Sequence, residues 1–371
     1  MINNEFKGMK LEFHILQSFP VTCLNRDDVG APKTAVVGGT TRARVSSQCW
    51  KRQVRIALHD MDVPMGKRTK LISKLIYNEC LEQGATVEQA EKCGAKVEAI
   101  FIKDTDKKEK KESDEKDDKS DTLLFFSPNE IYAIVNEFKS HNFDPEKVIT
   151  QKDVKKQAKE IEKIIGKIDS GVDALDIALF GRMVAQASRM DIEAASSFAH
   201  AISTHKVANE IDFFTALDDV SEDQGAAHMG SLEFNSATYY RYVSLNLGQL
   251  HHTLAGISLD KAVEYFIRAL FIAVPEARQH SQSGASPWEF ARIYLRKGQR
   301  IQVPFEKAIR PVNGGIVEPS KAEICAYLDK KEKLYASMFG KMRSFEYGED
   351  EKMDIDSLIN EIKKEIKAVE V

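Results

Sequence analysis

Six positively charged residues lie in one stretch of this 371-residue chain, and no acidic residue occurs between Asp28 and Asp60. They are Lys33, Arg42, Arg44, Lys51, Arg52 and Arg55. The whole chain has a formal net charge of -4, so this positive charge is local. Because clustered lysines and arginines attract phosphate groups, the stretch is a candidate anion-binding site.

The end of the basic stretch has the pattern of an amphipathic helix over residues 48–61. Ser46 and Ser47 can cap its first turn. Its apolar face is formed by Trp50, Val54, Ala57 and Leu58. A different face carries three long polar side chains, those of Gln48, Lys51 and Arg55. Because the positive end of the helix dipole lies beside them, the pattern predicts that this face binds an anion.

The ligand that suits this stretch best is a phosphodiester backbone. Gly38 and Gly39 let the chain approach a ligand closely or turn tightly, and hydroxyl donors follow them. The phosphate-loop signature GxxxxGK[ST] is absent, because Thr-Thr-Arg follows the glycine pair. The alternative is an ordinary solvated basic helix face. The concentration of glycines, hydroxyls and cations without an acid favours a nucleic-acid backbone over a small anion.

The composition, with 30% charged and 43% apolar residues, is typical of a soluble globular protein. The length predicts two or three domains, or one core with large insertions. The N-terminus lacks the pattern of a signal peptide, and apolar runs such as residues 270–274 are too short to span a bilayer. These features predict a cytoplasmic protein.

Neither the cysteines nor the histidines form a metal-binding pattern. The five cysteines are odd in number and include no CxxC pair, which argues against a disulfide framework and against structural zinc. No HExxH motif occurs among the nine histidines. Cys49 could be a reactive thiol, but no histidine or acid nearby in the sequence would activate it. We therefore expect no metal, no cofactor and no catalytic residue.

The order of predicted elements indicates an α+β fold. A half-buried strand is predicted over residues 11–19, where Leu11, Phe13 and Ile15 alternate with Glu12 and His14. The basic helix follows it. From residue 64 to about residue 171 the spacing becomes helical, with a capping box from Ser127 to Glu130. Within this region, residues 103–121 carry only charged and polar side chains and are predicted to be a disordered loop.

Strand patterns return over residues 198–204 and 239–247. The segment between them, residues 208–236, is predicted to project as a loop or a long hairpin that exposes apolar side chains. A helix over residues 259–272, a strand over residues 290–295 and a helical C-terminus follow. Without the insertions the order is βαββαβ, typical of a ferredoxin-like, RNA-recognition-motif-like sheet. No RNP1-type aromatic signature occurs, so we do not expect bases to stack on the sheet.

Several motifs resemble the CasC-type backbone subunit of the type I-E CRISPR surveillance complex, Cascade, within the RAMP superfamily. The first two are CLNRDD at residues 23–28 and GGTTRARVSSQCWKRQVR at residues 38–55. The later ones are LFGRM (179–183), AHAISTHKV (199–207), DFFTALDD (212–219), GAAHMGSLEF (225–234) and YYRYVSLNLGQL (239–250). The resemblance implies a hand-like fold. Its modified RNA-recognition-motif palm would span residues 1–62 and 173–371, with helical fingers over residues 63–172 and a thumb hairpin over residues 208–236.

The resemblance also implies a function. The chain would be a non-catalytic scaffold that polymerises head to tail along a guide CRISPR RNA, beside other Cascade subunits, and presents the guide for pairing with target DNA. The implied palm contacts are Arg26, Lys33, Ser46, Gln48, Lys51 and Arg55. Met183 would pack beside the kinked RNA, and Phe214, Thr215 and Met229 would wedge into the guide–target duplex. Met229, which replaces an aliphatic residue, and the charged segment 103–121 depart from the family pattern.

Other interpretations of the same residues remain open. By residue type alone, Met183 would be a core residue and Phe213 would be the buried partner of an exposed Phe214. Acidic residues of the thumb would allow a metal-dependent ribonuclease instead of a scaffold; they are Asp212, Asp218, Asp219, Glu222 and Asp223. A third possibility is a general binder of single strands outside any CRISPR assembly.

Overall fold

The computed structural model describes residues 5–101, 123–166, 171–184, 187–217 and 226–370. The chain divides into two compact units. Unit 1 comprises Met1–Met61, Ser196–Gly248 and Leu259–Val371, and unit 2 comprises Asp62–Ala195 and Gln249–Ser258. The predicted disordered loop, residues 103–121, lies outside the described residues. Within the described residues, no helix is long and apolar enough to cross a membrane.

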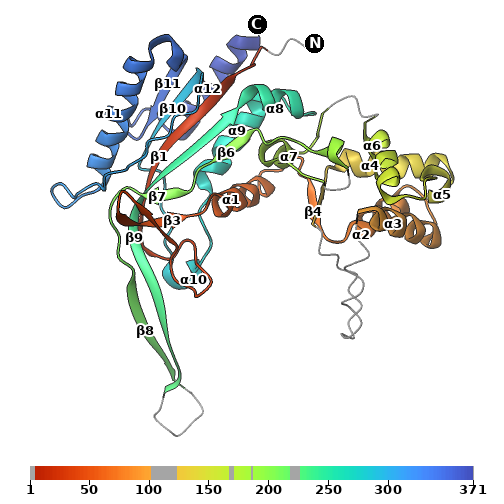
Figure 1. The fold of residues 1–371 in the computed structure, drawn as a ribbon, viewed down its shortest axis with the longest axis horizontal. Helices are drawn as coiled ribbons and strands as arrows, with labels where there is room; N and C mark the ends of the chain where they lie inside the picture. The colour runs from red at the N-terminus through yellow and green to blue at the C-terminus, as the bar shows by residue number, and fades with distance from the viewer. Residues whose placement is uncertain (1–4, 102–122, 167–170, 185–186, 218–225, 371) are drawn as a thin grey trace. The chain divides into compact units, whose positions relative to one another are not determined.

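Unit 1 is built on an antiparallel sheet around the long strand β1 (Met9–Thr22), which pairs with β9 and β10. Among the described residues, nine strands join this sheet along the path β11-β10-β1-β9-β7-β3-β2, with β6 and β8 paired to β9 beside it (Figure 1). Their bounds are β2 (Thr34–Val37), β3 (Thr40–Val45), β6 (Ser196–Phe198), β7 (Ala201–Ser203), β8 (Glu210–Leu217), β9 (Ala226–Asn246), β10 (Phe290–Lys297) and β11 (Lys341–Tyr347).

The predicted strands at residues 11–19, 239–247 and 290–295 are confirmed by β1, β9 and β10. The single strand predicted over residues 198–204 is wrong, because this segment forms the two short strands β6 and β7. Phe198 pairs with Val243 and Ile202 pairs with Tyr240, so the β6–β7 segment contains one more residue than the facing part of β9. The extra residue interrupts the ladder in the manner of a β-bulge.

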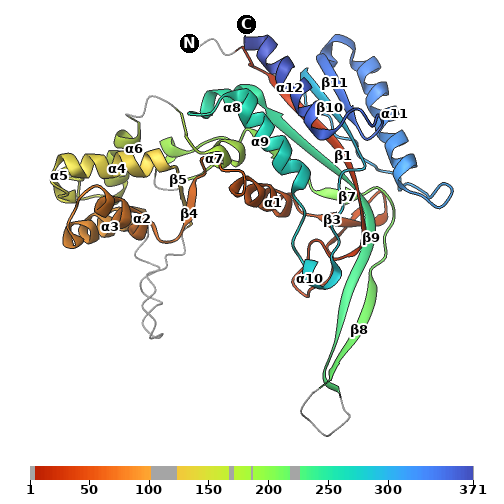
Figure 2. The same cartoon turned by 180° about the vertical axis from the view of Figure 1, so that it is seen from behind.

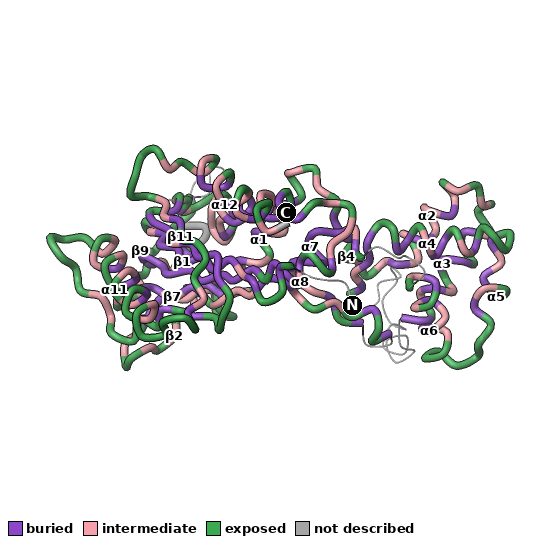
Figure 3. The backbone as a smooth tube through the Cα atoms, turned by 90° about the horizontal axis from the view of Figure 1, so that it is seen from above, coloured by how far each residue is buried: buried purple, intermediate pink, exposed green. Residues whose placement is uncertain are grey.

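Strand β1 is buried on both faces, so the prediction of a half-buried strand is wrong (Figure 3). On one face the ring of Phe13 lies 6.1 Å from the ring of Phe266 in α9 (Leu259–Ile272). On the other face Leu16 belongs to a cluster with residues of α11 (Val317–Tyr335). Glu12, which the alternation placed on this second face, is only 1% exposed. A helix that follows β1 by about 300 residues covers this face, and local spacing carries no sign of it.

The buried polar groups of β1 are satisfied by one connected network. Glu12 forms an ion pair with Arg296, accepts a hydrogen bond from the Tyr242 hydroxyl, and accepts another from the Ile301 N–H at 3.1 Å. His14 Nδ1 lies 2.8 Å from the Tyr240 hydroxyl. Burial lowers the pKa of His14 to about 3, so the imidazole is neutral at physiological pH. The network explains how the Glu12 carboxylate of β1 can be buried in the core while charged.

The other helices of unit 1 include α1 (Ser47–His59) and α12 (Ile355–Glu370), and both contact α9. Shorter elements are α10 (Gln279–Gln282) and the 3-10 helix η3 (Ala336–Phe339), while α8 (Leu247–Thr253) spans the boundary between the units. The hairpin of β8 and β9 extends from the sheet as a long ribbon (Figure 2). This is the long hairpin that the sequence predicted as one of two possibilities.

Unit 2 is mostly helical. Its main helices are α2 (Ile72–Glu82), α3 (Val87–Phe101), α4 (Pro128–Ser140) and α6 (Val154–Ile165). Shorter elements are β4 (Lys67–Thr69), β5 (Leu124–Phe126), α5 (Pro145–Val148), α7 (Leu175–Phe180) and η2 (Ser188–Met190). Both halves of the capping box predicted between Ser127 and Glu130 are present.

Unit 2 continues to Ala195, whereas the predicted helical insertion stops at residue 172. Three residues of this later segment, Val184, Ala187 and Met190, belong to the helical core cluster. Arg182 binds the Glu130 carboxylate in a buried bidentate ion pair of 2.6 and 2.9 Å, and its guanidinium also donates to the Met190 carbonyl. Glu130 therefore joins the cap of α4 to the segment that follows α7.

We expect Glu12→Gln to destabilise the protein by about 3–5 kcal/mol, because it leaves the buried Arg296 guanidinium without a carboxylate. Urea denaturation followed by circular dichroism would measure the loss. Glu323→Gln, an exposed substitution on α11, is the matched control and should change stability by less than about 0.5 kcal/mol. Equal stability of the two variants would contradict the assigned role of the ion pair.

Candidate nucleic-acid interface

The N-terminus of α1 is formed as the sequence predicted. Strand β3 leads in extended conformation to Ser46, whose hydroxyl accepts a hydrogen bond from the Cys49 N–H at 3.2 Å. Ser47 does not cap the helix; its N–H donates to His200 Nδ1 at 3.1 Å. The predicted apolar face is confirmed as buried, and Gln53 is buried with it. This burial fixes which side of α1 is presented to solvent.

The predicted polar face of α1 carries side chains with different degrees of exposure. Gln48 is exposed, whereas Lys51 and Arg55 are half-buried. The Lys51 ammonium lies 5.9 Å from the centroid of the Phe198 ring, and partial burial lowers the pKa of Lys51. Lys51 forms no ion pair within the described part of the chain. A half-buried ammonium without an acidic partner is a strong site for an incoming anion.

Arg26 and Lys33 lie in the loop before β2, which is tied to the start of α1. The Lys33 N–H donates to the Asn25 carbonyl, and the Arg44 N–H donates to the Lys33 carbonyl, both at 2.8 Å. Asn25 Oδ1 in turn accepts from the Ser46 N–H at 3.0 Å. The structure therefore connects the segments that carry Arg26, Lys33 and Ser46, although Ser46 itself is largely buried.

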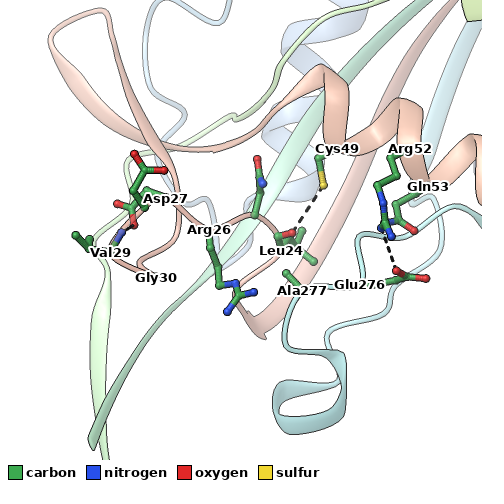
Figure 4. Close-up of a pocket in the computed structure, with 12 residues that line it drawn as sticks. Leu24, Arg26, Asp27, Val29, Gly30, Cys49, Arg52, Gln53, Glu276 and Ala277 are labelled. Atoms are coloured by element: carbon green, nitrogen blue, oxygen red, sulfur yellow. Dashed lines mark hydrogen bonds and ion pairs between the residues drawn. The ribbon is translucent and has the colours of Figure 1, made fainter. Parts of the chain in front are cut away.

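A cleft of about 720 Å³ lies between this loop and α1. Figure 4 shows Arg26 between the turn at Asp27–Gly30 and helix α1, with Arg52 beside Glu276 at the far side. Arg52 and Glu276 form an ion pair of 3.1 Å, and both side chains are exposed. Such a surface pair contributes at most about 1 kcal/mol, so a phosphate could compete for Arg52.

Two of the six basic residues serve the fold rather than a ligand. Arg42 is fully buried and donates to four backbone carbonyls, those of Ser203, Thr204, Phe305 and Glu306. Arg44 Nε donates to the Thr34 carbonyl at 3.3 Å. The count of six cations therefore overstates the charge available to an anion.

A buried arginine beneath α1 and a partly buried cysteine on the helix itself complete its surroundings. The guanidinium of Arg241 lies 3.7 Å from the centroid of the Trp50 ring, and burial lowers the pKa of Arg241 to about 9. Sequence reasoning missed Arg241, because its place within β9 carries no local sign of contact with α1. Burial raises the pKa of the Cys49 thiol to about 11, which opposes the alternative of a low-pKa nucleophile.

Met183, in unit 2, is 84% exposed. The alternative that Met183 is a core residue is therefore wrong. The neighbouring Arg182 and Val184 are buried, and they anchor the backbone on both sides of the methionine. An exposed methionine on a fixed backbone presents a flexible apolar surface to a ligand.

The β8–β9 hairpin separates the three thumb residues that the resemblance grouped together. Thr215 pairs with Met229 across the ladder, so their side chains share one face of the ribbon. Phe214 pairs with Gly230 and therefore lies on the opposite face. A Cβ on Gly230 would lie 2.7 Å from the Phe214 ring, so this ring packs over the glycine.

The expectation that Phe213 is buried beneath an exposed Phe214 is wrong. Phe213 is 64% exposed and Phe214 is 37% exposed. Phe213 shares the face of Met229, where Ile211 is also exposed. Phe214 is shielded because its partner Gly230 has no side chain to push the ring outward.

Of the five acidic thumb residues that the ribonuclease alternative would use, the structure describes only Asp212, which is exposed on β8. Asp218, Asp219, Glu222 and Asp223 lie outside the described residues. Elsewhere in the described part of the chain, no group of three or more His, Cys, Asp or Glu side chains could hold a metal ion.

A family model described as CT1975-like protein matches residues 11–367. A solved chain of a "CRISPR RNA-guided surveillance complex, pre-nicking" is 25% identical, with a TM-score of 0.77 over 96% of this chain and 99% of that chain. A chain of a "CRISPR RNA-guided surveillance complex" is 23% identical, with a TM-score of 0.69 over the same shares, and supports the fold alone. No curated protein matches the sequence.

We expect Ser46→Ala to lower stability by about 1 kcal/mol, because it removes the hydroxyl that caps α1. Ser46→Asp should restore the cap and the stability. Thermal unfolding of both variants would measure the effect. Ser47→Ala is the control and should shift stability by less than about 0.5 kcal/mol, since Ser47 does not cap the helix. A similar loss in Ser46→Ala and Ser47→Ala would rule out the cap assignment.

Proposed function

The chain belongs to the family of CT1975-like proteins, and from that premise we propose that it is a non-catalytic, RNA-binding scaffold subunit of a Cascade-type CRISPR surveillance complex. The observation that carries the proposal is the polar face at the start of α1. Gln48, Lys51 and Arg55 stand together there, and the loop with Arg26 and Lys33 is tied to the same helix end. A phosphate backbone is the ligand that such a set of donors and cations suits.

The sheet supports the proposal of a modified RNA-recognition-motif palm. Strands β10, β1, β9 and the β6–β7 segment lie in this spatial order, and every neighbouring pair is antiparallel. With α1 and α9 as the two connecting helices, this order supports a ferredoxin-like βαββαβ unit. Because α11 covers the second face of β1, bases cannot stack on this strand as in an ordinary motif.

In the proposed mechanism the protein holds the guide by its backbone and leaves the bases free. The Gln48 amide and the Lys51 and Arg55 cations bind phosphates, and the Ser46 hydroxyl, whose oxygen caps α1, donates its hydrogen to no residue that the structure describes. The protein would therefore recognise charge and shape rather than sequence. Pairing between the guide and target DNA would supply the specificity.

We propose that the β8–β9 hairpin acts as a thumb that separates bases. Phe214 lies on one face of the ribbon, and Phe213 and Met229 lie on the other, so the ribbon could contact bases with both faces. We also propose that the exposed Met183 packs beside the kinked guide RNA as a further apolar contact. A thumb that docks on the next copy makes a heterologous, non-closing contact and generates a filament.

We further propose that the complex is of type I-E and acts in the cytoplasm with the other Cascade subunits.

Purification of the complex tests the proposal. RNA that co-purifies with the wild-type chain should share a repeat-derived sequence tag, and a heterogeneous RNA population would overturn the CRISPR assignment. Lys51→Ala combined with Arg55→Ala should retain less RNA and weaken binding to all sequences alike. Because each phosphate contact to a single strand contributes about 0.7 to the salt dependence of log K, the slope should fall by about 1.4.

The control for this experiment removes the same charge from exposed sites outside the interface. Lys261→Ala combined with Lys364→Ala should leave both affinity and slope unchanged, since the two lysines lie on α9 and α12. A double variant at Lys51 and Arg55 that alters base preference but keeps the slope would contradict the phosphate assignment.

Loss of the apolar thumb residues should spare the phosphate contacts but weaken pairing with DNA. Phe214→Ala with Met229→Ala should assemble on guide RNA with the normal salt slope, yet bind complementary DNA more weakly by about 1–3 kcal/mol for each stacking contact removed. Because the two side chains lie on opposite faces, each single variant should show part of the loss. Chemical probing of the guide, with Ser231→Ala as control, would reveal whether the periodic displacement of nucleotides persists. An unchanged pattern with unchanged DNA affinity would limit these residues to a structural role.

A further inference from the structure

A second group of basic residues in unit 1 lines a cleft of about 710 Å³ that the α1 face does not include. Its lining comes from three parts of the chain: the β2–β3 turn with Gly38 and Thr40, the segment after β7 with Lys206, and residues 307–316. The charged side chains are Lys206, Lys307 and Arg310. We refer to this feature as the second basic cleft.

The three segments that line the second basic cleft are held together by buried interactions. Arg42 donates to the carbonyls of Ser203 and Thr204 at 2.9 Å and to that of Phe305 at 3.1 Å, so one guanidinium joins two of the three segments. The Ile309 N–H donates to the Thr204 carbonyl at 2.9 Å. The third segment is fixed by contact, because a Cβ on Gly38 would lie 1.9 Å from the Glu306 carbonyl oxygen. The spacing of the three cations is therefore a property of the fold.

The three cations of this cleft have no partner among the residues that the structure describes. Lys206, Lys307 and Arg310 are exposed, and their side chains form no ion pair or hydrogen bond with a described residue. None of the described residues that line the cleft is acidic. Elsewhere on unit 1 basic residues do find acids, as Arg52 pairs with Glu276 and Lys321 pairs with Glu318. The chain has a net charge of -4, so a cluster of cations without acidic partners is a surface where an external anion is attracted most strongly.

The imidazole of His205 in the same cleft is committed to the fold. Its Nε2 accepts from the Thr238 N–H at 3.1 Å, and its Nδ1 lies 2.9 Å from the Lys206 carbonyl, to which it donates. Both nitrogens are therefore used by the neutral form. The positive charge of the cleft comes from the two lysines and the arginine alone.

The second basic cleft and the α1 face lie at opposite ends of β3. Thr40 begins this strand and lines the cleft, whereas Val45 ends it beside the Ser46 cap. At about 3.3 Å per residue, the two ends are about 17 Å apart. One phosphate cannot touch both places, but one strand of nucleic acid, or two strands, can.

We propose that the second basic cleft binds the phosphodiester backbone of a nucleic-acid strand, as a contact separate from the α1 face. The inference rests on the proposed function, because it assigns a second nucleic-acid contact to the same scaffold. Long cationic side chains from two segments around an open cleft suit a chain of phosphates better than one enclosed anion. The backbone could belong to the guide RNA or to a DNA strand, which share this chemistry.

The test uses the full chain and a triple variant, Lys206→Ala with Lys307→Ala and Arg310→Ala. Fluorescence anisotropy would measure binding of a labelled single-stranded oligonucleotide, as RNA and as DNA of one sequence, over a range of salt. We expect at least tenfold weaker binding at low salt in one or both arms, and a salt slope lower by about 2 for three lost phosphate contacts. An unchanged melting temperature would show that the fold is intact.

The matched control removes three exposed, unpaired lysines outside the cleft: Lys261→Ala, Lys330→Ala and Lys364→Ala. This control carries the same change in net charge and should bind within twofold of wild type. If the cleft variant and the control bind both oligonucleotides equally well, the inference is overturned. If wild type binds neither oligonucleotide, both the proposed function and this inference are overturned. If Lys51→Ala with Arg55→Ala loses binding but the cleft variant does not, the second contact is refuted and the proposed function stands.

Ultraviolet cross-linking of the complex assembled on guide RNA, with complementary DNA added, identifies the source of the strand. Cross-linked peptides that span residues 304–310 should carry RNA if the cleft holds the guide and DNA if it holds the other strand. Either result supports the proposal. Cross-links confined to peptides of α1 and the β8–β9 hairpin would contradict it.

Discussion

The buried guanidinium of Arg42 holds together the edge of unit 1 on which both candidate binding surfaces depend. Burial lowers the pKa of Arg42, and no carboxylate offsets its charge within the described contacts. Four backbone carbonyls from two distant segments accept its hydrogen bonds instead. Charge-assisted hydrogen bonds of this kind can offset the cost of burying an ion. They fix β3, which ends at the cap of α1 and begins at the second basic cleft.

Both faces of the central strand β1 are covered by helices, and this limits where a ligand can bind unit 1. Helix α9 packs on one face of β1, and α11 with the residues before it packs on the other. The ion pair of Glu12 and Arg296 lies within the second face, so this face is a core and not a platform for bases. The surfaces that remain available to a ligand are the N-terminal end of α1, the clefts at the margin of the sheet and the β8–β9 ribbon. These surfaces offer charge and apolar edges, which suit recognition of backbone and shape.

The arginines of this chain show why residue type alone does not identify a binding site. Arg42, Arg182, Arg241 and Arg296 are all buried and hydrogen-bonded to the fold. Lys51 and Lys206, by contrast, have no acidic partner among the described residues. Whether a cation belongs to the core or to a ligand depends on the carbonyls and carboxylates around it. Those groups come from other parts of the chain.

The sequence by itself determined the features that rest on neighbours in the chain. Helix α1, its Ser46 cap, its buried face and the capping box at Ser127 follow from spacing and hydrogen bonds within a few residues. Only the tertiary structure decided the burial of Glu12, because α11 lies far along the chain. Strand register likewise set Phe214 and Met229 on opposite faces, and folding brought Thr40, Lys206 and Lys307 into one cleft. The physical reason is that periodicity reports which side of an element is apolar, whereas its partner is chosen by contacts that no local pattern records.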